Sequence, residues 1–217
     1  MVTQITNQIG TVLKSWGVIM DCSLLWKKGQ QLIERSRERL PEHSQMVLDL
    51  WLDMLAKAQE TEAQLDTAIE EEAGHDEDCQ ILMSIPGVGP FTALAVAAEA
   101  GDISRFASAA HLISYCGLSP SVHSSGGKTY YGKLSKACNK ILRYALLLRG
   151  GSVGRLQGDN PLKKTYWRVV FRNHRNSAKV AVARQMVRVM YSMLKNRTVW
   201  NPAKLVKASG STAAAAA

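Results

Sequence analysis

The chain has 217 residues, of which 46% are apolar and 21% are charged. This composition can bury a core and excludes a disordered polyelectrolyte. Lysine and arginine number 27 against 18 aspartates and glutamates, giving a formal net charge of +9 at pH 7, which favours a polyanionic partner, either nucleic acid or an anionic membrane surface.

Three amphipathic helices are expected in the N-terminal part of the chain. Apolar residues recur at helical spacing over 3–16, where Gly17 provides a stop, and a second helix over 27–40 should end before Pro41. No glycine or proline lies between Pro41 and Gly74, so a long helix is expected there. Because long amphipathic helices commonly pair, residues 1–75 are predicted to form a helical linker or coiled coil that favours a homo-oligomer.

Charge divides the sequence into two segments. Residues 42–78 contain twelve acids and one basic residue, Lys57, whereas residues 128–197 contain seventeen basic residues and one acid, Asp159. A solvated helix face explains the acidic run, since a smooth run does not bring metal ligands together. The C-terminal segment is therefore the one expected to face a polyanion.

Short helices separated by glycine turns are predicted for residues 76–200, which we expect to form one domain. A loop rich in serine and glycine is predicted at 119–132, because no strand pattern extends beyond four residues. The predicted fold class is mainly α, with residues 201–217 as a disordered tail. The expected helices of this domain span 79–85, 91–100, 108–116, 135–148, 161–174 and 177–196.

A glycine turn joins the first two of these helices. The letters IPGVGP place Gly87, Val88 and Gly89 just before the helix that begins near Phe91. Backbone N–H groups at a helix start can hold a phosphate without a charged side chain, the pattern of a helix-hairpin-helix module. An ordinary tight turn between packed helices is the alternative.

The serine- and glycine-rich segment contains the parts of an activated hydroxyl nucleophile. A serine there is flanked by His123, a candidate base, and by Lys128, a cation that could hold an anionic centre. From spacing alone this indication is weak, since most such segments are only loops.

Aromatic and basic residues alternate on the last two predicted helices, a pattern that can contact bases and phosphates. We expect instead that the aromatic side chains are core, because Trp167, Val170, Phe171 and His174 fall at core spacing. The scattered cysteines and histidines predict neither a metal site nor a disulfide framework. With no basic-then-apolar leader at Met1 and no apolar run long enough for a bilayer, a cytoplasmic protein without a membrane partner is expected.

Four motifs within about 60 residues, in order, carry a family resemblance. They are the IPGVG turn, the GLSP turn, the HSSGGK segment and the SKACNKILR helix. Together they resemble the C-terminal transposase domain of the Piv-like insertion-sequence transposases. Members of that family join a RuvC-like nuclease domain to a serine-bearing domain and are guided by a bridge RNA. The N-terminal helices resemble the linker coiled coil of this family, so the resemblance extends to about Asn196.

The resemblance implies DNA transposition, in which a serine attacks a DNA phosphodiester and forms a covalent protein–DNA intermediate. The serine that matches is Ser125, with Ser124 as the runner-up. DNA and a guide RNA are the implied partners. Nucleic-acid contacts are expected from the glycine turn and from basic residues near the serine, namely Lys128, Lys133, Lys136, Lys140 and Arg143.

The resemblance also leaves an alternative open. The metal-binding carboxylates of the RuvC-like half have no counterpart in this sequence, so Mg²⁺ is expected only together with that half. This chain alone is therefore expected to be inactive, and its status as an enzyme is open. The alternative function is a non-catalytic helix-hairpin-helix module that binds nucleic acid, the remnant of a truncated transposase.

Overall fold

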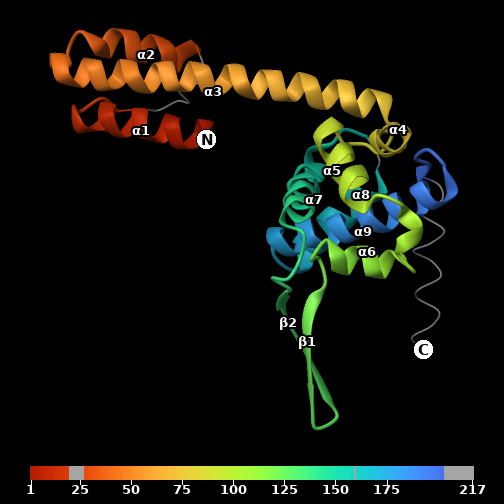
Figure 1. Ribbon diagram of the computed structural model, residues 1–217. Helices are drawn as coiled ribbons and strands as arrows, with labels where there is room; N and C mark the ends of the chain where they lie inside the picture. The colour runs from red at the N-terminus through yellow and green to blue at the C-terminus, as the bar shows by residue number, and fades with distance from the viewer. Residues whose placement is uncertain (20–26, 159, 203–217) are drawn as a thin grey trace. The chain divides into compact units, whose positions relative to one another are not determined.

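The computed structural model describes residues 1–19, 27–158 and 160–202 (Figure 1). The prediction of a mainly α fold is confirmed, with one addition, a small antiparallel hairpin. The elements are α1 (Val2–Ser15), α2 (Lys27–Arg37), α3 (Glu42–His75), α4 (Glu77–Met83), α5 (Pro90–Ala100), η1 (Ile103–Arg105), α6 (Ala109–Tyr115), β1 (Pro120–Ser125), β2 (Lys128–Leu134), α7 (Lys140–Ser152), η2 (Val153–Arg155), α8 (Pro161–Arg172) and α9 (Arg175–Asn196).

Two compact units divide the chain, residues Met1–Ala68 and Ile69–Ala217. The proposed tail at 201–217 lies almost wholly outside the described residues. None of the helices in the described part of the chain is long and apolar enough to cross a membrane.

The first unit packs α1, α2 and most of α3 around a small apolar core. In α1, Ile5, Ile9 and Leu13 recur every four residues and are buried, which places them on one face of the helix. The helix ends as predicted, with Gly17 at a φ of 75°. The helix α2 ends three residues before the predicted position, because Arg39 and Leu40 form turn hydrogen bonds to Ser36 and Arg37.

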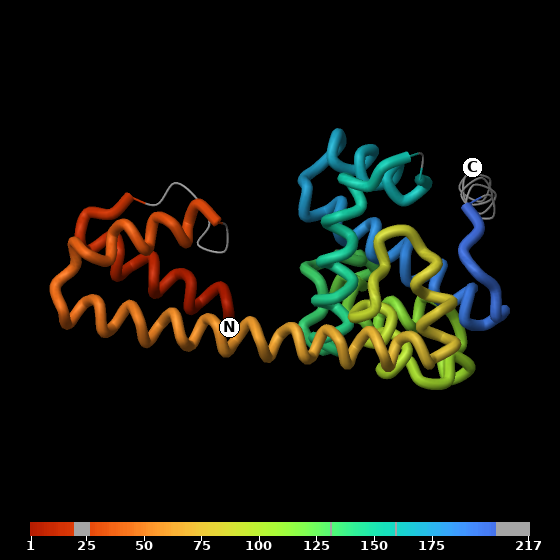
Figure 2. The backbone as a smooth tube through the Cα atoms, turned by 90° about the horizontal axis from the view of Figure 1, so that it is seen from above, coloured from red at the N-terminus to blue at the C-terminus, as the bar shows by residue number. Residues whose placement is uncertain are grey.

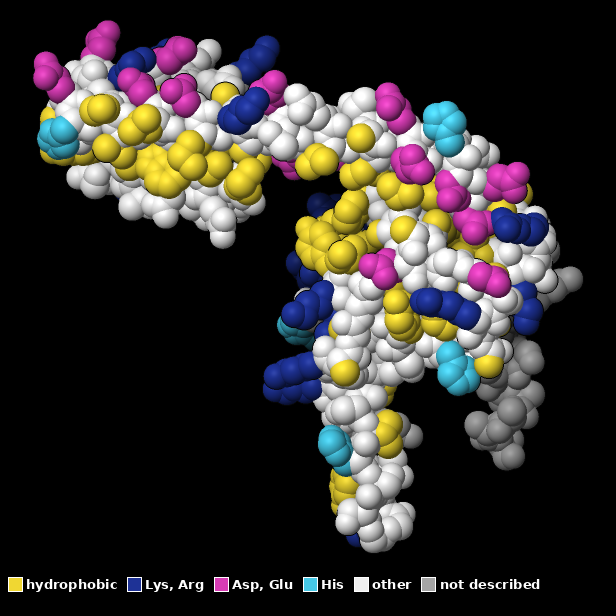
Figure 3. Space-filling model, viewed as in Figure 1, with side chains coloured by type: hydrophobic (Ala, Val, Ile, Leu, Met, Phe, Trp, Pro, Cys, Tyr) yellow, Lys and Arg dark blue, Asp and Glu magenta, His cyan; other side chains and the backbone are white. Residues whose placement is uncertain are grey.

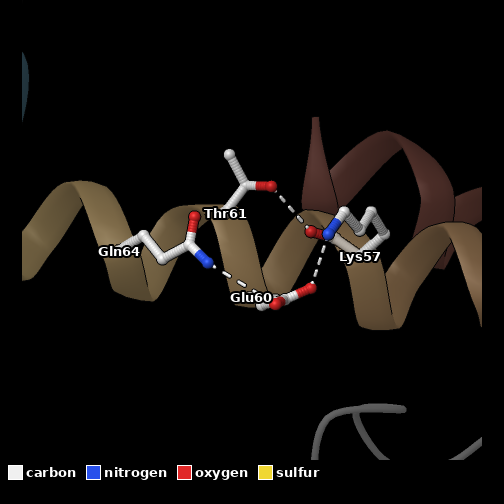
Figure 4. Close-up of polar contacts among 4 residues, drawn as sticks. All are labelled: Lys57, Glu60, Thr61 and Gln64. Carbon is white, nitrogen blue, oxygen red and sulfur yellow. Dashed lines mark hydrogen bonds and ion pairs between the residues drawn. The ribbon is translucent and has the colours of Figure 1, made fainter.

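The long helix predicted between Pro41 and Gly74 is confirmed as α3. Its exposed middle is supported by contacts within the helix itself (Figure 4). The Lys57 ammonium lies 2.8 Å from Glu60, and the Thr61 hydroxyl donates to the Lys57 carbonyl at 2.9 Å. Such pairs three or four residues apart stabilise a helix by a few tenths of a kcal/mol each, about 0.2–0.5.

The second unit is built around α9, whose apolar face is buried against α6, α7 and α8 (Figure 1). The predicted helices of this unit are all present, but α7 begins five residues later than expected. Asn139 explains the difference, because its side chain accepts the N–H groups of Ile141 and Leu142 and so caps the helix at this point.

The prediction of a loop at 119–132 is wrong. These residues form most of a β-hairpin in which β1 and β2 pair antiparallel. Gly126 and Gly127, with φ values of 57° and 75°, supply the two positive φ angles that a tight two-residue turn requires. The side chains along β1 are largely exposed, so the apolar alternation that identifies a half-buried strand is absent from the sequence.

Candidate nucleic-acid interface

The hairpin carries both candidate serines near its tip. Ser125 is the last residue of β1 and lies opposite Lys128, the first residue of β2, across the two-glycine turn. Both residues are exposed. A hydroxyl at this position is accessible to a ligand as large as a nucleic-acid strand, and the nearest residue across the turn is a cation.

The two serines differ in their surroundings. Ser124 Oγ lies 3.2 Å from Thr129 Oγ1 on the neighbouring strand, so one of its hydrogen-bonding positions is used within the hairpin. Because successive side chains of a strand point to opposite faces, Ser125 shares a face with His123, whereas Ser124 lies on the other face. The predicted base and the predicted nucleophile are therefore on the same side of β1.

Two arginines hold the base of the hairpin. The Arg143 guanidinium, from α7, donates through Nη2 to the carbonyl of Gly117 at 2.7 Å and to that of Ser135. These carbonyls precede β1 and follow β2, so one side chain ties both ends together. Arg184, from α9, donates through Nε to the Leu118 carbonyl at 2.6 Å. Burial, followed by the nearby charge of Arg188, lowers the pKa of Arg184.

Close packing at the hairpin base depends on a glycine. Gly117 has a φ of +66°, and a Cβ there would collide with both the Arg143 guanidinium and Cys138. A larger residue would displace the arginine from the two carbonyls. The GLSP motif, which begins at Gly117, and the SKACNKILR motif, which ends at Arg143, are therefore in contact in the folded chain. Their order in the sequence does not reveal this contact.

The sequence-predicted cations occupy two kinds of position. Lys128, Lys133, Lys136 and Lys140 are exposed along the hairpin and at the start of α7. Arg143 is half-buried and bonded to the protein's own carbonyls, an arrangement that favours a role in positioning the hairpin. Two further basic side chains of the second unit also bond within the protein: Lys163 donates to the Leu156 carbonyl and Arg149 donates to Thr92.

The predicted glycine turn lies between α4 and α5. Gly87 has a φ of +87° and packs on Leu156, with 3.3 Å between its ideal Cβ position and the leucine side chain. The Val88 side chain is buried, and its N–H donates to the Ile85 carbonyl at 3.0 Å. Gly89 caps α5. Val88 is therefore part of the turn's own hydrogen bonding. In the first turn of α5, Pro90 has no N–H and the Ala93 N–H donates to the Gly89 carbonyl, so the N–H groups left for an anion there are those of Phe91 and Thr92.

The expectation that the aromatic side chains of α8 are core is wrong for two of them. Trp167 is 41% exposed and Phe171 is 84% exposed, and His174 is exposed as well. Tyr166 is the aromatic residue of α8 that enters the core. The helix buries the face that carries Leu162 and Tyr166, one residue out of register with the predicted face.

The described residues contain no group of three or more histidine, cysteine, aspartate or glutamate side chains that could hold a metal ion. The Mg²⁺ implied by the family resemblance therefore has no fitting site among them, and no chemical step is assigned to it. Cys79 and Cys116 are buried. Burial raises the pKa of each thiol to about 12, with the charge of Asp76 contributing further for Cys79.

The segment that contains the glycine turn and the exposed serine hairpin also matches a known protein family in sequence. Residues 79–167 match the Transposase IS116/IS110/IS902 family. This segment runs from α4 into α8. It includes the glycine turn, the β-hairpin and the two ends of the hairpin, at Gly117 and Ser135, that Arg143 ties together. Over these residues the chain is therefore similar to the transposase domain of this family.

Curated relatives agree with this class. The chain is 28% identical over 202 residues to the transposase for insertion sequence element IS1111A of Coxiella burnetii, covering 91% of this chain and 56% of that protein. It is 26% identical over 199 residues to the transposase for IS1328 of Yersinia enterocolitica, covering 90% and 59%. A protein of insertion element IS110 from Streptomyces coelicolor is 33% identical over 123 residues, covering 55% and 29%. The chain thus spans less than two thirds of the length of these relatives.

Proposed function

We propose that this chain is the DNA-handling part of an insertion-sequence transposase and that Ser125 is its nucleophile. The observation that carries the proposal is the hairpin itself, since the serine stands at an exposed tip, opposite Lys128, in the segment that matches the transposase family. Ser124, which is engaged with Thr129, remains the second candidate.

In the proposed reaction, Ser125 Oγ attacks a DNA phosphorus while one P–O bond of the strand breaks. The phosphodiester energy is kept in the new Ser–O–P ester, and the released DNA hydroxyl can reverse or redirect the step. The serine proton leaves to a base, for which His123 on the same face of β1 is the candidate within this chain. Lys128 and the further exposed lysines reduce the charge repulsion between DNA and an incoming oxyanion.

Contacts to the DNA backbone are proposed for the start of α5 after Gly87, Val88 and Gly89, in the manner of a helix-hairpin-helix, and for the exposed lysines of the hairpin and of α7. For Arg143 we propose a positioning role at the hairpin base. A guide RNA is proposed as a further partner on the family resemblance. Mg²⁺ and the remaining catalytic groups are proposed to come from a RuvC-like half.

Strand cleavage by the complex with a RuvC-like half tests the nucleophile. Ser125→Ala should abolish the covalent protein–DNA adduct while DNA affinity, measured by fluorescence anisotropy, stays within about twofold, because an exposed hydroxyl contributes little to backbone contacts. Ser124→Ala is the matched control and should retain the adduct. Loss of the adduct in Ser124→Ala alone would reassign the nucleophile, and unchanged cleavage in both variants would favour the non-catalytic binding module.

Self-association is proposed for the first unit. Met46, Leu50 and Met54 follow one another every four residues on α3 and are all exposed, and Figure 3 shows apolar side chains gathered along this unit. A stripe of this kind favours pairing with a second helix. Leu50→Lys should lower the mass measured by light scattering, whereas Gln64→Lys, on an exposed polar position, should leave it unchanged.

A further inference from the structure

An aromatic and basic surface lies on α8, away from the serine hairpin in sequence and outside the contacts assigned above. We define the α8 patch as Trp167, Arg168, Phe171 and Arg172. At about 100° per residue these positions fall within one arc of the helix, opposite the buried residues Leu162 and Tyr166. Figure 2 shows α8 at the outer edge of the C-terminal unit.

The aromatic side chains of the patch are held in a defined arrangement. The Trp167 and Phe171 rings lie 6.1 Å apart with an interplanar angle of 38°, and the Trp167 ring meets the buried Tyr166 ring edge-on at 5.5 Å. The buried Tyr166 ring therefore holds the exposed Trp167 ring in place. A phenylalanine that is 84% exposed gains little from folding, and adjoining exposed aromatic rings mark an interaction surface.

The charge of the α8 patch and of the elements around it indicates what kind of partner would bind there. Arg168 and Arg172 lie beside the two rings, on one side of them around the helix, and both are exposed. The chain has a single acid after Asp102, namely Asp159, so α8 and the two elements packed most closely on it, α9 and η2, contain no acidic residue. The partner should thus be an anion that also presents flat apolar faces. Unpaired bases on a phosphate backbone have both properties, whereas duplex DNA hides its base faces in the stack.

We propose that the α8 patch binds single-stranded nucleic acid, with bases stacking on Trp167 and Phe171 and phosphates meeting Arg168 and Arg172. The proposal deepens the nucleic-acid function proposed above and rests on it. It names a second site with a different ligand class, unpaired strand in place of duplex backbone. Single-stranded DNA and RNA share this chemistry, and a preference for RNA would indicate a contact to the 2′-hydroxyl.

The test measures binding of the full chain to labelled 15-mers of oligo(dT) and oligo(U) and to a mixed-sequence duplex of the same length. Trp167→Ala and Phe171→Ala should each weaken single-strand binding by about tenfold, while duplex affinity stays within about twofold. Tyr144→Ala is the control, because Tyr144 is an aromatic residue on α7 that is 63% exposed. Since Phe171 is almost fully exposed, its replacement should leave the thermal unfolding midpoint unchanged.

Each outcome decides one question. Selective loss of single-strand binding in the α8 variants supports the patch, and the two 15-mers then distinguish DNA from RNA. Equal loss for single strand and duplex, or no loss, overturns the stacking proposal but leaves the proposed function standing. A fall in oligomer mass with unchanged single-strand binding would assign the patch to self-association. If the wild-type chain binds none of the three probes, the proposed function fails as well.

Discussion

Replacing Arg143 with methionine should loosen the hairpin at its base while the helical core stays folded. Methionine keeps much of the aliphatic volume of arginine but removes the Nη2 group that donates to the Gly117 and Ser135 carbonyls. The two ends of the hairpin then keep the Ser135 N–H to Ser119 carbonyl bond of 3.2 Å and the Arg184 bond to Leu118.

The magnitude follows from the bonds that are lost. A hydrogen bond from a charged donor contributes about 2 kcal/mol, so two such bonds contribute about 4 kcal/mol. Arg143 Nε is buried without a hydrogen-bond partner in the described structure, and removing that unpaired donor returns about 2 kcal/mol. The net loss of about 2 kcal/mol corresponds to about a 30-fold rise in the population of the opened hairpin base.

Hydrogen exchange read by mass spectrometry measures this population. Peptides covering residues 117–136 should exchange about 30-fold faster in Arg143→Met, whereas peptides from α9 should keep the wild-type rate. Arg143→Lys should fall between, because a single ammonium can reach one carbonyl but lacks the planar fork. Arg168→Met, an exposed arginine on α8, is the control. Wild-type exchange over 117–136 in Arg143→Met would refute the idea that this side chain fixes the hairpin.

Other positions give sharp expectations. Gly117→Ala combines a positive φ with a collision and should lower the free energy of unfolding by about 2–4 kcal/mol in denaturant titration. Gly126→Asn should preserve hairpin protection in hydrogen exchange and Gly126→Val should reduce it, because asparagine tolerates φ of 57° and valine does not. Leu48→Ala, at a fully buried site of the first unit, should cost about 2–5 kcal/mol in the melting of that unit. Cys79 and Cys116 should resist alkylation at pH 8 until the protein unfolds. Since burial raises the pKa of both thiols from the ordinary value of 9.0 to about 12, their contribution to stability is full below pH 9 and falls between pH 9 and 12.

Helix existence was largely readable from the sequence, because it depends on local periodicity and on stops. The run of apolar residues in α3 and the absence of glycine and proline from Pro41 to Gly74 place a long helix without reference to any other part of the chain. The four ordered motifs likewise indicated the transposase family, which residues 79–167 match.

Pairing and burial required the tertiary structure. The hairpin escaped prediction because both faces of β1 are largely exposed, so its pairing is set by the Gly126–Gly127 turn and by anchoring from α7 and α9. The buried face of α8 was not predicted correctly for a related reason. Periodicity gives the angular spacing of the aromatic residues but not which arc meets α9, and a shift of one residue exposes Trp167 and Phe171.

The charge of the chain can likewise be divided into what the sequence determines and what the tertiary structure determines. The sequence by itself determined the basic surplus after Lys128 and hence the attraction to polyanions, because net charge is a sum over residues. Only the tertiary structure decided which cations are free to meet a ligand. Arg143 and Arg184 are bonded to backbone carbonyls that come from segments 26 and 66 residues away in sequence, and contacts over such separations exist only once the chain has folded.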